Sequence, residues 1–255
     1  MFPLSTFNFQ PAHMLSLNHI SVSVQEKEVV TDVSLDFSVG KNYCLLGKNG
    51  SGKSSLALAI MGHPHYQITA GEATIDGEAL NDMTPDVRAQ KGIFLAFQTI
   101  PEIKGVKVFE FLRTIYNIAH ETKETFVSFK KIILPHLDLL SIDKEFLRRD
   151  LNVGFSGGER RKLELLQLRL LKPRYIFLDE VDSGLDVDAF KAVAKLLAET
   201  AGPETCLIII THYFTILEYI SVDEVIVLQE GKIVAQGDMS LVERIKQEGF
   251  GEIGQ

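Results

Sequence analysis

Residues 47–54 read G-K-N-G-S-G-K-S and fit the phosphate-binding pattern G-x-x-x-x-G-K-[ST]. An apolar run over 42–46 leads into them, and a helix-like run over 53–61 follows. Glycines in such a place let the backbone turn its N–H groups toward phosphate oxygens, and the positive end of the following helix adds to the attraction. We expect Lys53 to reach the β- and γ-phosphates of ATP and the Ser54 hydroxyl to bind Mg²⁺. The residues expected around the phosphates are Gly47, Lys48, Asn49, Gly50, Ser51, Gly52, Lys53, Ser54 and Ser55.

A second apolar run, over 175–178, ends in the two carboxylates Asp179 and Glu180. One carboxylate in that place can hold Mg²⁺ through water, and its neighbour can act as general base on an attacking water. We assign Asp179 to the metal and Glu180 to the water. The alternative is a strand end with two solvated acids, but the phosphate loop upstream favours the metal and base roles.

The segment Phe155–Glu159, F-S-G-G-E, opens a helix-like run over 160–171. Ser156 is a suitable helix N-cap, and Gly157 and Gly158 expose backbone N–H groups, so the segment can form a second anion site. A plain capped helix start would be the simpler interpretation of this segment alone. The phosphate loop and the paired carboxylates in the same chain favour the anion site.

The elements that must position these motifs predict an α/β fold. Apolar strand-like runs alternate with helix-like ones, which is typical of a parallel sheet. Alternating runs and an Asp-Gly turn predict a small antiparallel sheet beside it. The expected strands cover 42–46, 92–97, 175–178, 206–210 and 224–228 in the parallel sheet and 15–24, 29–37 and 71–78 in the antiparallel one. We expect a loose extension over 1–13 and one domain over 14–255, with a helical insertion at about 99–172.

Composition restricts the class of protein. The 255 residues are 45% apolar and carry a net charge of −8, so they offer no basic field for nucleic acid, and no apolar run is long enough to span a membrane. Cys44 and Cys206 lie in apolar runs, which predicts buried, reduced thiols. With no basic residue before Lys27 to suggest a targeting peptide, we expect a cytoplasmic protein. Two thiols are too few for an iron–sulfur cluster, which usually takes about four.

Taken in order, the motifs resemble those of the ABC ATPase family over roughly 14–245. Gln98 matches the Q-loop, Phe155–Glu159 the signature (with Glu159 where Gln is usual), 183–186 the D-loop and His212 the switch histidine. A polar strand end, a helix cap and a core histidine are the simpler alternatives for Gln98, Asp186 and His212. The resemblance implies an ABC-type P-loop ATPase with a RecA-like parallel-sheet core, an antiparallel β flank and a helical insertion.

The same resemblance implies how the residues act. Two copies would meet head to tail, with Ser156, Gly157 and Gly158 of one closing on the γ-phosphate held by the other. Gln98 and His212 would sense the γ-phosphate and Mg²⁺, and Asp186 would lie at the seam between the copies. In an idle single chain, Arg160 or Arg161 could pair with Glu180.

Within that family, several stretches are similar to the ATPases of the Suf iron–sulfur cluster assembly system. These stretches are 92–98, 101–103, 105–106, 152–159, 178–180, 182–189, 211–213 and 248–251. Val181 and Asp182 also stand where most transporter ATPases have Pro-Thr. This resemblance implies SufB and SufD as partners, with a partner surface around 98–106. It also has departures: Lys104 replaces a common Pro, and no aromatic residue near 24–30 offers a platform for adenine. The nucleotide-binding subunit of an ABC membrane transporter and an ATP-sensing module remain alternatives, and Glu180 counts against the second.

Overall fold

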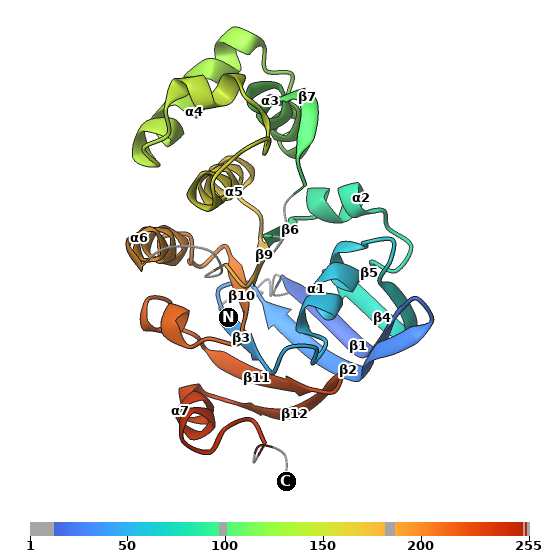
Figure 1. Cartoon of the computed structure of the whole chain (residues 1–255). Helices are drawn as coiled ribbons and strands as arrows, with labels where there is room; N and C mark the ends of the chain where they lie inside the picture. The colour runs from blue at the N-terminus through green and yellow to red at the C-terminus, as the bar shows by residue number, and fades with distance from the viewer. Residues whose placement is uncertain (1–12, 97–100, 182–186, 252, 254–255) are drawn as a thin grey trace, which may run out of the picture.

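The computed structural model describes residues 13–96, 101–181, 187–251 and 253 of the chain. Gln98 and Asp186, with the rest of the expected D-loop, lie outside the described residues. Figure 1 shows a central sheet with helices on one side and a second sheet with helix α1 (Lys53–Met61) on the other. A helical region lies at one end of this arrangement, above the sheets in that view.

The central sheet has six strands in the order β12-β11-β3-β10-β9-β6. Their bounds are β3 (Asn42–Leu46), β6 (Ile93–Ala96), β9 (Tyr175–Asp179), β10 (Cys206–Thr211), β11 (Glu224–Gln229) and β12 (Lys232–Gly237). All neighbours are parallel except β11 and β12, so the predicted parallel sheet is confirmed and β12 is an addition. In the register, Thr211 pairs with Leu46 and Ile210 with Asp179, so the carboxyl ends of β3, β9 and β10 meet at one edge.

The predicted antiparallel sheet is also confirmed, in the order β2-β1-β4-β5. Its strands are β1 (Met14–Val24), β2 (Lys27–Ser38), β4 (Gln67–Ile75) and β5 (Glu78–Ala79). The turn at Asp76 and Gly77 joins β4 to β5, and β4 begins earlier than the sequence predicted. The short helix α2 (Pro85–Gln90), which we did not expect, follows this sheet.

The segment expected to be helical contains α3 (Val108–Ala119), α4 (Phe126–Leu139), the 3₁₀ helix η1 (Lys144–Arg148) and α5 (Gly157–Leu171). It also contains a two-stranded antiparallel sheet of β7 (Ile103–Lys107) and β8 (Asp150–Leu151), which the sequence did not predict. Every residue of β7 is exposed, and a strand with no buried face leaves no apolar period in the sequence. The remaining elements are α6 (Val187–Ala198), η2 (Thr215–Glu218) and α7 (Met239–Glu248).

Two apolar cores lie on opposite faces of the central sheet. Along β3, Tyr43 and Leu45 belong to the core beneath α1 and the antiparallel sheet, whereas Cys44 and Leu46 belong to the core beneath the other helices. Strands buried on both faces explain the continuous apolar runs in the sequence. Cys44 and Cys206 are buried free thiols, as predicted, and burial raises the pKa of Cys44 to about 12. No helix in the described part of the chain is both long and apolar enough to cross a bilayer.

Candidate nucleotide site

The phosphate-binding loop joins β3 to α1 and is packed too tightly for side chains at two of its glycines. A Cβ at Gly47 would lie 2.2 Å from the carbonyl oxygen of Leu228, and a Cβ at Gly52, where φ is +104°, would lie 2.7 Å from that of Val29. The backbone N–H of Gly231 also donates to the Ser51 carbonyl at 3.0 Å. The loop is therefore fixed by β2 and by the β11–β12 turn, which lie far from it in sequence.

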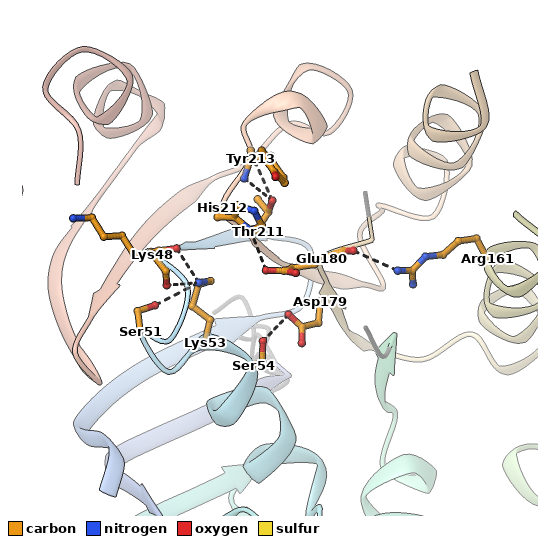
Figure 2. Close-up of polar contacts among 11 residues, drawn as sticks. Lys48, Ser51, Lys53, Ser54, Arg161, Asp179, Glu180, Thr211, His212 and Tyr213 are labelled. Carbon is orange, nitrogen blue, oxygen red and sulfur yellow. Dashed lines mark hydrogen bonds and ion pairs between the residues drawn. The ribbon is translucent and has the colours of Figure 1, made fainter. Parts of the chain in front are cut away.

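Lys53 is folded into the concavity of this loop, as Figure 2 shows. Its Nζ donates to the carbonyl oxygens of Gly47 at 2.8 Å and Lys48 at 3.0 Å, and the residue is only 4% exposed. Burial lowers the pKa of Lys53, and the charges of Glu180 and Asp179 oppose that shift. An ammonium group is thus placed beside a hollow of about 300 Å³, which is lined by residues 49–55 and Glu180.

Ser54 and Asp179 meet across the edge of the sheet. The Ser54 hydroxyl donates to Oδ1 of Asp179 at 2.9 Å, and Asp179 is 4% exposed. Burial raises the pKa of Asp179, while the hydrogen bond from Ser54 lowers it. A hydroxyl and a carboxylate are hard oxygen donors of the kind that Mg²⁺ prefers. Among the described residues no cluster of three or more His, Cys, Asp or Glu side chains could hold a metal ion, and Mg²⁺ commonly completes its shell with water and substrate phosphates.

Glu180 directly follows β9, and its backbone is in the left-handed region, with φ of +46°. Its backbone N–H donates to the carbonyl of Ile210 at 2.9 Å, and its Oε1 lies 3.0 Å from Nδ1 of His212 (Figure 2). Such a backbone costs about 1–3 kcal/mol for a residue other than glycine and is common at functional sites. The kink directs the carboxylate to the same edge as Lys53 and Ser54, and there it lines the hollow.

The side chains of the arginines beyond the signature do not form the expected ion pair with Glu180. Arg161 donates to the backbone carbonyl of Glu180 at 3.3 Å (Figure 2). Its other terminal nitrogen pairs with Glu164 at 2.6 Å. Arg160 pairs with Glu102 at 3.3 Å. Both guanidinium groups pair with other carboxylates, Arg161 with Glu164 on the same helix and Arg160 with Glu102. The expectation was therefore wrong for the Glu180 side chain, although Arg161 does contact the Glu180 backbone carbonyl.

The signature segment forms the start of α5, as the sequence indicated. The Ser156 hydroxyl accepts from the N–H of Glu159, and the Glu159 carboxylate accepts from the N–H of Ser156, which makes a full capping box. Ser156 and Gly157 are exposed. Ser156, Gly157 and Gly158 are not among the residues that line the hollow at the phosphate-binding loop. Within one chain, the structure brings together 47–55, Asp179, Glu180 and His212, but it leaves the signature outside that group.

Two residues, Arg149 and Glu102, contact the signature or the glycine before it with no signal in the sequence. Arg149 pairs with Glu159 and donates to the Gly154 carbonyl at 3.1 Å. Glu102 accepts from the N–H of Gly154 at 3.4 Å.

A larger hollow of about 840 Å³ lies beside 101–103 and is lined in part by Phe94, Pro101, Ile103, Phe111, Ile115 and Ile118.

The comparisons with known proteins agree with this geometry. Residues 30–183 match the family model described as ABC transporter. The probable ATP-dependent transporter ycf16 of Cyanidium caldarium is 39% identical over 93% of this chain and 95% of its own length. A probable ABC transporter ATP-binding protein of Streptococcus pyogenes serotype M3 is 41% identical over 95% of both chains. The probable ATP-dependent transporter slr0075 of Synechocystis is 40% identical over 93% of this chain and 94% of its own length.

The chain is also similar to solved structures. One is described as the ATP-binding subunit of an ABC transporter; its TM-score is 0.75 at 23% identity, covering 94% of this chain and 95% of that one. Another is the dimeric ATP-binding cassette MJ0796 in a post-hydrolysis state with ADP and phosphate, with a TM-score of 0.75 at 19% identity over 88% of this chain and 98% of that one. At these identities the likeness is one of fold.

Proposed function

Because the chain belongs to the ABC transporter family and is an ABC-type ATPase, we propose that it is the ATP-hydrolysing subunit of a Suf-type scaffold for iron–sulfur cluster assembly. In this role it is a SufC-type protein that acts with SufB and SufD. ATP-driven closure of two copies would reshape those partners while a cluster is built on them.

The observation that carries this proposal is the position of the residues that resemble the Suf ATPases. Phe94, Pro101 and Ile103 belong to the matching stretches and line the 840 Å³ hollow, which we call the docking groove. Ile103 and Ile118 in its lining are 42% and 52% exposed. An apolar hollow with exposed isoleucines suits a partner protein. The resemblance therefore lies on a surface that could select the partner.

The phosphate side of the proposed mechanism follows from the residues around the loop. Lys53 and the loop N–H groups bind the β- and γ-phosphates, and Ser54 and Asp179 would hold Mg²⁺. When bound, that ion would neutralise charge on the phosphates. Glu180 accepts a proton from the attacking water. His212, whose Nδ1 lies 3.0 Å from Oε1 of Glu180, orients the Glu180 carboxylate.

The second half-site comes from another copy of the chain. The exposed N–H groups at the start of α5 would close on the γ-phosphate held by the first copy. ATP then favours the closed pair, because it makes contacts there that it lacks with either copy alone. Hydrolysis removes the γ-phosphate and those contacts, so the pair can reopen. Asp186 and Gln98, assigned to the seam and to γ-phosphate sensing, keep those roles as proposals.

Affinity purification from native extract tests the partner assignment. The unchanged chain should recover SufB and SufD. Ile103→Glu combined with Ile118→Glu places two charges in the docking groove and should abolish recovery while ATP binding persists. Val127→Glu is the matched control, since Val127 is 65% exposed in the same helical region but does not line the groove.

The second candidate function is the ATPase subunit of a membrane transporter. The names of the relatives from Cyanidium and Synechocystis favour it, since both are called probable ATP-dependent transporters. Recovery of membrane permeases in place of SufB and SufD would decide for the transporter and against the Suf role.

A further inference from the structure

The signature segment carries a negative charge where it is expected to receive an anion. Glu159 lies in the first turn of α5, at the helix end whose N–H groups would face the γ-phosphate of a second copy. An acid in this position stabilises the helix, but its charge repels a triphosphate approaching the same turn. A glutamine would cap the helix without that repulsion. A second group must therefore neutralise the Glu159 charge if a triphosphate is to bind at this turn.

Arg149 is the residue that neutralises Glu159. One oxygen of Glu159, Oε2, accepts from the N–H of Ser156 at 2.8 Å, and the other, Oε1, pairs with the Arg149 guanidinium. Each carboxylate oxygen thus has a hydrogen-bond partner, and the oxygen that does not take part in the capping box is the one paired with the positive charge of Arg149. The backbone hydrogen bond from Ser156 lowers the pKa of Glu159 most, and the contact with Arg149 lowers it further. The carboxylate therefore stays ionised and paired.

The same guanidinium is held in place by its other contacts. It lies 4.3 Å from the ring centroid of Phe155 and donates to the Gly154 carbonyl at 3.1 Å. The Phe155 ring is buried and contacts Phe146 of η1, with centroids 4.6 Å apart. Arg149 therefore fastens the residues directly before Ser156 to the helical region and leaves Ser156 and Gly157 exposed.

We propose that Arg149 is the positioning residue of the second anion site: by pairing with Glu159 and holding Gly154 and Phe155, it presents an electrically neutral, fixed signature turn to the ATP bound by a second copy. The inference rests on the proposed head-to-tail closure and assigns a role to a side chain that touches no substrate. It predicts that the charge of Glu159 is harmful only when Arg149 is missing.

A double-mutant cycle in the Glu180→Gln background tests this prediction, with ATP-dependent dimerisation followed by analytical ultracentrifugation. Arg149→Met should raise the ATP concentration needed for half-dimerisation by roughly tenfold, because it leaves the Glu159 charge facing the triphosphate and also removes the contact with the Phe155 ring and the hydrogen bond to Gly154. Adding Glu159→Gln should return it to within about threefold of Glu159→Gln alone. Arg148→Met is the control, because that side chain is 79% exposed and pairs only with Glu145 among the described residues.

The outcomes separate the inference from the mechanism beneath it. If the Glu180→Gln parent does not dimerise with ATP, head-to-tail closure is wrong and the inference fails with it. If the parent dimerises but Arg149→Met matches Arg148→Met, or Glu159→Gln gives no rescue, the inference alone fails. Binding of a fluorescent ATP analogue by the single chain reports on folding in each variant. If Arg149→Met proves unstable, Arg149→Lys replaces it in the cycle. Lysine keeps the charge beside Glu159 but lacks the second nitrogen that holds Gly154, so its loss should lie between that of Arg149→Met and that of the parent.

Discussion

The two proposed halves of the nucleotide site are built in opposite ways. The half around Lys53 and Asp179 lies at the edge of a six-stranded sheet, and both residues are 4% exposed. The half around Ser156 begins a helix outside that sheet, exposes its first residues, and is held by side chains such as Arg149 and Glu102. One half is fixed by the sheet and its core, whereas the exposed turn of the other is held by the buried Phe155 and a few polar contacts at the surface.

This difference assigns separate tasks to the two halves. A buried, strained edge can hold charges in place before ATP arrives, which favours chemistry. A surface turn held by ion pairs can respond to a partner, because each pair contributes little and is easily rearranged. The core-anchored half should therefore decide rate and affinity, and the surface half should decide when closure occurs.

The largest effect is expected from Glu180→Gln. The variant keeps the shape of the side chain and loses the proton acceptor, so turnover should fall by about 10²–10⁴ while ATP binding persists. Single-turnover hydrolysis and equilibrium binding measure the two quantities. Glu243→Gln, at an exposed carboxylate on α7, should hydrolyse normally. Normal turnover by Glu180→Gln would show that Glu180 is not the general base.

Lys53→Ala should come next in size. The lysine is the buried cation of the loop, and losing its charge-assisted contacts to phosphate should weaken ATP binding by roughly a hundredfold. Isothermal titration with ATP gives the dissociation constant. Lys41→Ala, at an exposed lysine before β3, should bind within about twofold of the unchanged chain. Equal affinity for the two variants would show that the loop backbone alone holds the phosphates.

The core-anchored half could be predicted from sequence because its signals are local. The loop pattern and the apolar runs before Gly47 and Asp179 each lie within a few residues of the feature that they specify. The family comparison then confirms the predicted ABC-type α/β fold. Sequence periodicity found the long helices α3 and α4 for the same reason.

What the sequence did not predict depends on distant pairs or on short, exposed elements. Arg149 and Glu102 act on the signature through contacts across 10 and 52 residues, which no period reveals. β7 has no buried face, and α2 spans 6 residues. The helix α7 was also not predicted, although its N-cap, Asp238, is a local signal. The sequence therefore predicted the N-cap Ser156 of the surface half, but only the structure shows the contacts that hold that half in place.

A smaller effect is expected from Glu102→Gln, which tests whether the surface half responds to a partner. Glu102 lies between Pro101 and Ile103 of the docking groove and accepts from Gly154 and Arg160. Pairs this exposed are worth about 0–1 kcal/mol. If the proposed partners SufB and SufD stimulate the ATPase, Glu102→Gln should reduce that stimulation by roughly threefold while their binding persists. Glu110→Gln, at a carboxylate paired with Arg113 on α3, is the control. Undiminished stimulation would show that the groove and the signature are independent.

The smallest expected effect is on stability, from Asp179→Asn without nucleotide or Mg²⁺. Burial raises the pKa of Asp179 in the folded chain above that in the unfolded chain. The folded chain therefore holds this proton more tightly, and stability from this group falls as pH rises through the folded pKa. At neutral pH the buried charge is a cost that asparagine removes, while an amide oxygen can still accept from Ser54.

The melting temperature of Asp179→Asn should exceed that of the unchanged chain by roughly 2–4 °C at pH 7, the shift that about 1 kcal/mol produces at this chain length, although hydrolysis is lost. The gain should shrink as pH is lowered toward about 4, where an ordinary carboxyl takes up its proton. Asp36→Asn, at an exposed carboxylate of β2, should melt as the unchanged chain does. A lower melting temperature for Asp179→Asn at every pH would mean that the carboxylate stabilises the sheet edge, and the core-anchored half would then carry no stored electrostatic cost for chemistry to use.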